Sequence, residues 1–297
     1  MIDVRRLKLL HEFAQQGTVA ATADAMQLTG PAVSQQLAVL EREAGVPLLE
    51  KRGRNVVLTA AGRLLVSHAD IIFGDLNAAE SALAALKASG TGTVRLAAFP
   101  TAARALVAPM WTDVPGVSLR LVEGEPDAAT ALLHEEADIA IVHSYTLLPR
   151  PTPANCEVHD ILEEPVLFAL SAGAAARRGL APGQKVRLAR FAEDTWLAPS
   201  KEFSCNEMIQ RACGAAGFVP DIVAEASDFS VLIALVATDA GVALVPRMAI
   251  PDGHGPISLH PLAAPVTRKV YALTRMGSAR RPDIRAVLGR LGAHLAD

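Results

Sequence analysis

The apolar positions near the N-terminus recur at helical spacing in three short segments. The first two segments meet at Gly17-Thr18, where Thr18 is placed to cap the second helix. The third segment begins after Thr29, carries Pro31 in its first turn and ends at Gly45. Its inward face follows the period of a helix: Val33, Leu37, Leu40 and Ala44. The pattern predicts a small unit of three packed helices.

A short basic hairpin follows the third helix. The stretch PLLEKRGRNVVLT, residues 47–59, holds two β-type runs on either side of Lys51-Arg52-Gly53-Arg54-Asn55. Arginines at the tip of a turn are more often simply solvated charge. Directly after three helices, however, this tip takes the place of a wing, and a narrow minor groove attracts arginine. The order of elements therefore predicts a winged helix-turn-helix DNA-binding domain over residues 1–58.

A single long helix is predicted next, with Thr59 as its N-cap. At 1.5 Å per residue it would span roughly 40 Å, which is too long to stay packed on the preceding domain. Its apolar positions step by 7, 4, 3, 4 and 3 residues, a heptad seam that needs a partner helix. We interpret residues 59–89 as a linker and dimerisation helix. Its predicted seam is Leu65, Ile72, Leu76, Ala79, Leu83 and Leu86.

After a joint rich in Gly and Thr, strand-like runs alternate with helical patterns over residues 90–297. This alternation is typical of right-handed βαβ units and gives an overall α/β fold. Irregular stretches at 157–165 and 261–267 are interpreted as two crossings, which divide the region into two small subdomains. Subdomain I is predicted to contain residues 90–162 and 266–297, and subdomain II residues 163–265. The expected strands are Val94–Phe99, Ser118–Val122, Asp138–His143, Pro165–Ser171, Thr195–Ala198, Ile222–Glu225, Val242–Val245 and Lys269–Thr274.

Composition narrows the class of protein. The 297 residues are 51% hydrophobic but only 4% aromatic. No apolar run reaches the ~18 residues of a membrane helix. Charges are scattered through the N-terminus, unlike in a signal peptide, and three cysteines fit reduced thiols better than a disulfide framework. We expect a cytoplasmic protein without a membrane segment, metal or cofactor.

Charge gives no global drive toward nucleic acid, because the net charge is −3. Residues 1–60 hold seven Lys or Arg against six acids, and none of these cations lies between Thr18 and Glu41. The phosphates must then be held by cations that flank the reading helix. The flanking cations are Arg5, Arg6, Lys8, Lys51, Arg52 and Arg54. A pair of chains would double this modest charge, so the dimer is expected to be the form that binds DNA.

Residues 18–62, TVAATADAMQLTGPAVSQQLAVLEREAGVPLLEKRGRNVVLTAAG, resemble the LysR-type transcriptional regulators. The most specific pieces are the alanine-rich second helix, PAVSQQLAVLE, the G-x-P-L-L-E turn and L-T-x-A-G. The runs ADIAIV and DAGVALVP extend the resemblance almost to the C-terminus. It implies a winged helix, a linker helix and an effector domain of two Rossmann-like subdomains, similar to periplasmic binding proteins. The implied partners are a pseudo-palindromic promoter in double-stranded DNA, a small-molecule effector, further copies of the chain in a homodimer or homotetramer, and RNA polymerase.

The third helix carries the candidate DNA-reading residues. Small residues in its first turn allow close approach, Gln35 can pair with adenine, and Ser34 can bond a phosphate or a base. Any capped amphipathic helix can also show Ser and Gln outside. Many family members have a basic residue directly after the serine, where this chain has Gln35. The predicted DNA-binding set is Thr29, Pro31, Ala32, Ser34, Gln35, Arg52 and Arg54.

The candidate effector site lies beyond the carboxyl ends of strands, where doubly wound sheets bind ligands. Helix N-termini at such a cleft favour a small anion or carboxylate, and Ser204 with Glu207 has the spacing of a capping box. In the resembling family, the segments at Thr101-Ala102 and 200–205 line the inducer site. Plainer roles are caps, core positions or solvated charge. The predicted effector-binding set is Pro100, Thr101, Ala102, His143, Ser200, Phe203, Ser204, Phe229 and Arg247.

Three alternatives remain beside this interpretation. Cys205 and Cys213 suggest a thiol-based redox sensor of the same family, although an eight-residue gap on one helix rises about 12 Å, beyond disulfide reach. A cytoplasmic solute-binding protein would not need the winged helix. An enzyme is not expected, because the sequence holds no P-loop, zincin or nucleophile-elbow motif.

Overall fold

The computed structural model describes residues 1–53, 55–87, 92–124, 132, 136–153, 156–251 and 253–293. The chain divides into two compact units. Unit 1 contains Met1–Ala84 with the short segments Ala154–Glu157 and Arg275–Arg281, and unit 2 contains the remainder. Among the described residues, no helix is both long and apolar enough to cross a membrane.

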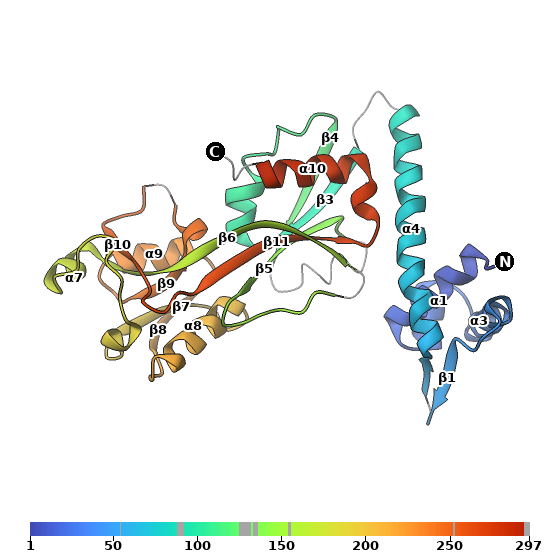
Figure 1. The fold of residues 1–297 in the computed structure, drawn as a ribbon, viewed down its shortest axis with the longest axis horizontal. Coiled ribbons are helices and arrows are strands. Elements are labelled where there is room, and N and C mark those ends of the chain that lie inside the picture. Colours follow the sequence, from blue (N-terminus) through green and yellow to red (C-terminus); the bar gives the residue numbers. More distant parts are fainter. Residues whose placement is uncertain are drawn as a thin grey trace. The chain divides into compact units, whose positions relative to one another are not determined.

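The first 58 residues form three helices and a two-stranded hairpin (Figure 1). The helices are α1 (Val4–Gln16), α2 (Val19–Ala25) and α3 (Gly30–Ala44), and the hairpin is β1 (Leu49–Arg52) with β2 (Asn55–Leu58). The expected caps are present: Thr18 Oγ1 accepts from the Ala21 N–H, Thr29 Oγ1 accepts from the Ala32 N–H, and Gly45 ends α3 with φ +72°. The helices enclose one core around Leu10, Val33 and Leu40. The predicted winged helix-turn-helix is confirmed.

The long helix α4 spans Ala60–Lys87. Four of the predicted seam residues are exposed along it, as expected for a helix face that packs against a second helix: Ile72, Leu76, Ala79 and Leu83. Leu65 differs from the prediction, because it packs, half-buried, against the core of the winged helix, while Leu64 is 61% exposed. The side chain of Leu86 lies outside the described residues. The exposed apolar stripe therefore begins after the first turns of α4, because those turns pack against the core of the winged helix.

Within the described residues, unit 2 is built on a seven-stranded sheet with the order β10-β6-β11-β5-β3-β4, and β9 pairs with β6 outside this path. The separate pair β7-β8 is parallel, as are β3-β4 and β3-β5. The strands are β3 (Gly92–Ala98), β4 (Val117–Glu123), β5 (Ile139–Tyr145), β6 (Cys156–Ser171), β7 (Thr195–Pro199), β8 (Asp221–Ala226), β9 (Ala243–Pro246), β10 (Ile257–Pro261) and β11 (Thr267–Arg275). The helical elements are α5 (Pro100–Ala102), η1 (Ala103–Val107), α7 (Ala172–Arg177), η2 (Leu188–Phe191), α8 (Ser204–Ala215), α9 (Phe229–Ala237), η3 (Arg247–Ala249), η4 (Ser278–Arg280) and α10 (Pro282–Ala293).

Two features of this sheet differ from the prediction. Residues 157–165, expected as an irregular crossing, belong to the continuous strand β6, and β10 was not predicted. The strand continues because alternate side chains, Glu157, His159 and Ile161, are half-buried or buried, while Val158 and Asp160 between them are exposed. Two apolar cores lie on unit 2, one around Val94, Ile141 and Val270 and the other around Phe168, Trp196 and Leu244. The two subdomains thus share strands rather than loops.

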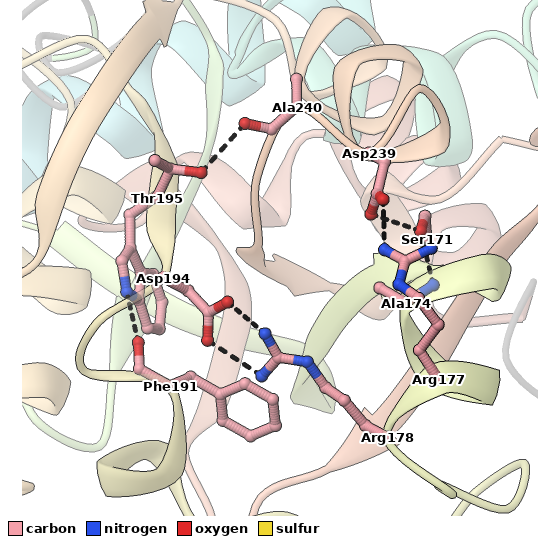
Figure 2. Close-up of polar contacts among 10 residues, drawn as sticks. Ser171, Ala174, Arg177, Arg178, Phe191, Asp194, Thr195, Asp239 and Ala240 are labelled. Atoms are coloured by element: carbon pink, nitrogen blue, oxygen red, sulfur yellow. Dashed lines mark hydrogen bonds and ion pairs between the residues drawn. The ribbon is translucent and has the colours of Figure 1, made fainter.

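A set of ion pairs fixes the turns of the second subdomain (Figure 2). Asp239 adopts a left-handed backbone with φ +66°, which is unusual for a residue other than glycine. Its carboxylate accepts a hydrogen bond from Ser171 Oγ (2.6 Å) and pairs with Arg177, and these bonds hold the pKa of Asp239 below its ordinary value. Arg178 pairs in the same way with Asp194. These contacts fasten α7 to the turns that precede β7 and β9.

Replacing Leu76 and Leu83 of α4 by Glu should break the dimer, because two charges in the seam would face their counterparts across the pair. Sedimentation velocity of the full chain measures the result, and we expect a shift from dimer or larger to monomer. The matched control replaces Ser67 and His68 by Glu, which adds the same charge at exposed polar positions of the same helix. An unchanged oligomer in the Leu variant would contradict the seam.

Candidate functional site: a DNA-reading helix and a ligand cleft

Helix α3 presents the polar residues that the sequence predicted. Pro31, Ser34 and Gln35 are exposed and Ala32 is half-buried, while Thr29 caps the helix. Arg52 lies at the hairpin tip with 78% of its side chain exposed, beside Glu50 at 3.4 Å. Arg54 lies outside the described residues. The structure thus brings an exposed polar helix face and a basic tip together in one small unit.

Two acids of this unit, Glu41 and Glu43, hold its elements together. Glu41 Oε1 accepts hydrogen bonds from the backbone N–H groups of Leu48 (2.8 Å) and Leu49 (3.0 Å), which fixes the entry to the wing. Glu43 pairs with Arg6, whose Nε also donates to Gln36 (2.9 Å). Arg6 was expected to face the phosphates, and this expectation was wrong because the guanidinium bridges α1 and α3. Because Arg6 and Glu43 cancel one another's charge, their pairing leaves the net charge of this unit unchanged.

A narrow cavity of about 20 Å³ in unit 2 gathers the carboxyl ends of several strands. It is room for about one water-sized group. Most of its lining is apolar and aromatic, with few polar groups. The lining residues are Phe99, Pro100, Thr101, His143, Pro199, Phe203, Cys205, Ser227, Phe229 and Arg268. Both subdomains contribute, as expected for a ligand site at the crevice of a doubly wound sheet.

Arg268 is the one fully charged side chain in this lining. It is 1% exposed and pairs with Glu164, which is 8% exposed, with its Nε 2.8 Å from Glu164 Oε1. The Arg268 Nη1 donates to Thr101 Oγ1 (3.3 Å), and the guanidinium lies over the Phe99 ring at 5.2 Å. The second oxygen of Glu164 accepts from the backbone N–H of Met248. The cation is therefore fixed in position, and Glu164 does not line the cavity.

His143 lies beside this cation. The register of β5 and β11 pairs Val270 with His143 and Arg268 with Tyr145, so alternate residues place these side chains on one face of the sheet. His143 Nε2 lies 3.1 Å from Ser204 Oγ, which links β5 of one subdomain to α8 of the other. Burial, and then the charges of Arg268 and Arg150, hold the pKa of His143 well below its ordinary 6.5. The imidazole is thus neutral at physiological pH.

A wider cavity of about 440 Å³ adjoins the narrow one, and the two share Pro100, Thr101, Phe203 and Ser227. Its remaining lining is charged or small: Arg104, Glu123, Gly124 and Asp228. The Nη2 of Arg104 donates to the carbonyls of Met248 (3.1 Å) and Ala249 (3.0 Å). Together the two cavities form one cleft with a narrow inner end and a wide mouth.

The structure brings together five of the nine predicted effector-binding residues. Pro100, Thr101, His143, Phe203 and Phe229 line the cleft. The other four do not line it: Ala102, Ser200, Ser204 and Arg247.

The expected capping box is wrong. Helix α8 starts at Ser204 itself, after Phe203, and Glu207 pairs with Arg211 instead. Ser204 is not part of the lining, but its Oγ lies 3.1 Å from Nε2 of His143, which is. Arg247 is exposed on η3, away from the cleft lining, so it is not the cation that a carboxylate would meet.

That cation is Arg268, which sequence reasoning missed. The predicted crossing ended at residue 267 and the predicted strand began at Lys269, so Arg268 was assigned to neither. A signal was present, because Arg268 shares its strand face with Val270 and Ala272, both buried. A cation on a core face requires an acid, and Glu164 in the other crossing is the available one. Of the other lining residues, Arg104, Glu123 and Asp228 carry no local pattern that marks them in advance.

The thiols do not support a redox sensor. Cys205 and Cys213 are both buried on the unbroken helix α8. Burial raises the pKa of Cys213 to about 12, so its reactive thiolate is scarce at neutral pH.

Two family models match the chain. One is described as "LysR substrate binding domain" and matches residues 87–296. The other is described as "Bacterial regulatory helix-turn-helix protein, lysR family" and matches residues 4–63. HTH-type transcriptional regulator CbbR of Rhodospirillum rubrum is 24% identical over 297 residues, 98% of this chain and 96% of that protein. Transcriptional dual regulator GltC of Bacillus subtilis is 27% identical over 252 residues, 83% of this chain and 81% of that protein.

Solved structures share the fold. A mutant form of Corynebacterium glutamicum OxyR is 23% identical with a TM-score of 0.58, covering all of this chain and 92% of that one. Full-length CbnR in complex with its target DNA is 22% identical with a TM-score of 0.52, covering 99% of both chains. These likenesses show the arrangement of a helix-turn-helix domain with a two-subdomain α/β domain.

Replacing His143 by Gln should flatten the pH dependence of stability below pH 6.5. In the unfolded chain this histidine takes up a proton below about pH 6.5, whereas in the folded chain its lowered pKa keeps it neutral. The unfolded state then binds more protons than the folded state, so the free energy of unfolding decreases as the pH is lowered below 6.5, by up to about 1.4 kcal/mol per pH unit. Urea unfolding between pH 7.5 and 5.0, followed by tryptophan fluorescence, measures it, because Trp111 and Trp196 both lie in unit 2.

The control for this experiment is His254→Gln, which changes an exposed histidine of the same unit and should leave the slope as in the unaltered protein. Equal slopes for His143→Gln and the unaltered protein would show that His143 titrates normally in the folded chain.

Proposed function

The chain belongs to the LysR family of bacterial transcriptional regulators, which makes it an effector-responsive DNA-binding regulator, and we propose that its effector is a small carboxylate or related anion bound in the cleft of unit 2. The observation that carries this proposal is the buried Arg268 guanidinium in the cleft lining. A buried cation held in fixed geometry is a ready partner for a carboxylate. The relatives named above are transcriptional regulators, and none is named as an enzyme.

Thr101 is proposed as the second contact. It is buried, lines both parts of the cleft and already accepts a hydrogen bond from Arg268. Its hydroxyl can donate to an incoming carboxylate while Arg268 holds its oxygen lone pair. His143, neutral and bonded to Ser204, bridges the two subdomains beside the same point. A ligand here would change contacts of both subdomains at once, which is how binding can shift a conformational equilibrium.

On the DNA side, Ser34 and Gln35 are proposed to read bases and Arg52 to hold phosphate or the minor groove. Their support is exposure on α3 and on the hairpin tip, together with the helix-turn-helix match over residues 4–63. The domains are proposed as 1–58, 59–89 and 90–297, and the cellular location as the cytoplasm. Homo-oligomers of this kind, paired through α4, would place two reading helices on two half-sites.

Arg52→Ala should weaken binding to specific and non-specific DNA alike, because a phosphate contact carries no sequence information. Each lost contact lowers the slope of log K against log salt by about one. Fluorescence anisotropy with promoter DNA at roughly 50 to 300 mM salt measures the slope. Arg187→Ala, an exposed arginine of unit 2, is the control. If the slope of the Arg52 variant equals that of the control, the hairpin is not a wing on DNA.

Thr101→Val should reduce the affinity for a carboxylate effector by about tenfold, the effect of one lost hydrogen bond to a charged group. A thermal-shift screen of metabolites on the full chain identifies binders, and calorimetry compares the variants. Thr112→Val, at an exposed threonine of the same unit, is the control and should bind normally. A screen whose binders are all uncharged, or a binder unaffected by Thr101→Val, would place the effector elsewhere.

A further inference from the structure

The cleft carries opposite charge at its two ends. The narrow inner end presents the Arg268 guanidinium, and the wide mouth presents the carboxylates of Glu123 and Asp228. The two ends are joined by the shared residues Pro100, Thr101, Phe203 and Ser227. A ligand that fills both parts therefore meets a cation at one end and two acids at the other.

Glu164 balances the charge of Arg268 but does not satisfy all of its hydrogen-bond donors. One oxygen of that carboxylate faces Arg268 and the other accepts the Met248 N–H, so both are committed. Glu164 is absent from the cavity lining, whereas Arg268 is part of it. The Arg268 Nη2, though close to Glu164, has no well-directed hydrogen-bond acceptor among the described residues. A buried donor of this kind calls for an acceptor, and a ligand carboxylate supplies one.

The negative end is not cancelled by Arg104. Its guanidinium donates to the Met248 and Ala249 carbonyls, which lie outside the mouth. Asp228 uses one oxygen, Oδ1, to cap α9 at the Ser230 N–H (2.8 Å). Within the described part of the chain, no cation pairs with Glu123 or Asp228, and both are exposed to the mouth. Two carboxylates against one engaged guanidinium leave the mouth with a net negative charge.

Aromatic rings lie at the inner end of the cleft and at its junction with the mouth. Phe99, Phe203 and Phe229 line the inner end, and Phe203 continues into the mouth. Rings of this kind stabilise a hydrocarbon body rather than a polar one. A plain carboxylate would gain contact with Arg268 but would leave its other end in an acidic field. A plain amine could pair with the carboxylates of the mouth, but it would offer no hydrogen-bond acceptor to the buried guanidinium of Arg268.

We propose that the effector is a small zwitterion: an amino carboxylate with an apolar carbon body. Its carboxylate faces Arg268 and Thr101, and its ammonium group faces Asp228 and Glu123. This inference rests on the proposed function and narrows the class of ligand for the same cleft. The test uses compounds that differ only in one charged group, so the two assignments fail separately.

The experiment titrates the full chain by calorimetry with two sets of three probes. The first set is L-leucine, 4-methylpentanoate and 3-methylbutylamine. The second is 5-aminopentanoate, pentanoate and butylamine, which sets the two charges further apart. In at least one set, we expect the zwitterion to bind about tenfold or more tightly than either single-charge analogue, as one added ion pair at a partly enclosed site would give.

Two variants separate the ends of the cleft. Asp228→Asn with Glu123→Gln removes the negative mouth while keeping the cap acceptor of α9, and should lower zwitterion affinity about tenfold yet leave the carboxylate analogue unchanged or tighter. Arg268→Lys keeps the charge beside Glu164 but loses the forked donors, and should weaken both. Tryptophan fluorescence verifies that each variant is folded.

The outcomes are distinct. If the plain carboxylates bind as tightly as their zwitterions, and the mouth variant changes nothing, the zwitterion inference is overturned while the anionic effector of the proposed function stands. If amines bind best, both assignments fail. If none of the six probes binds, the apolar amino carboxylate is rejected, and the Thr101 comparison alone then decides the proposed function.

Discussion

The ion pair between Arg268 and Glu164 is the interaction on which the ligand cleft depends. Two charges taken out of water cost several kcal/mol, and the cost is offset only when geometry and further hydrogen bonds are good. Here Thr101, Met248 and the Phe99 ring supply those contacts from both subdomains. The pair therefore fixes the end of β3, the start of η3 and the strands β6 and β11 relative to one another. The neutral state of His143 follows from the same cluster, since burial beside a fixed cation disfavours a second charge.

Much of the fold could be predicted from the sequence, because short-range rules decide it. Thr18, Thr29 and Gly45 mark helix ends by chemistry that acts over four residues, and the structure has them in those roles. The strand runs were found wherever an apolar stretch was bounded by turns. The exceptions are β10, in which only His260 is buried, and the first half of β6, where exposed residues alternate with half-buried ones. Alternation over a strand that changes partners along its length is hard to distinguish from an irregular crossing.

The candidate site was less predictable, because its residues meet only in three dimensions. Thr101 follows β3 and His143 lies near the end of β5, so both were found by that rule. Arg268 lies inside β11 on the face of Val270 and Ala272, and its place beside His143 becomes visible only from the register of β5 and β11. Glu41 and Glu43 are the reverse case, since their charge counts against DNA binding in the sequence but is consumed inside the domain. The net charge of a domain is thus a poor guide to DNA binding when its acidic side chains have structural partners.

The continuity of β6 and β11 through both subdomains restricts how this domain can respond to its ligand. A loop between subdomains would act as a free joint, whereas strands that stay hydrogen-bonded to neighbours in one sheet resist bending and yield mainly in twist. The response should then be elastic and graded: a small rotation about the sheet, largest at the edges and least along the shared strands. In a regulator built this way, ligand binding would change the twist of the sheet rather than open or close the cleft between two rigid subdomains.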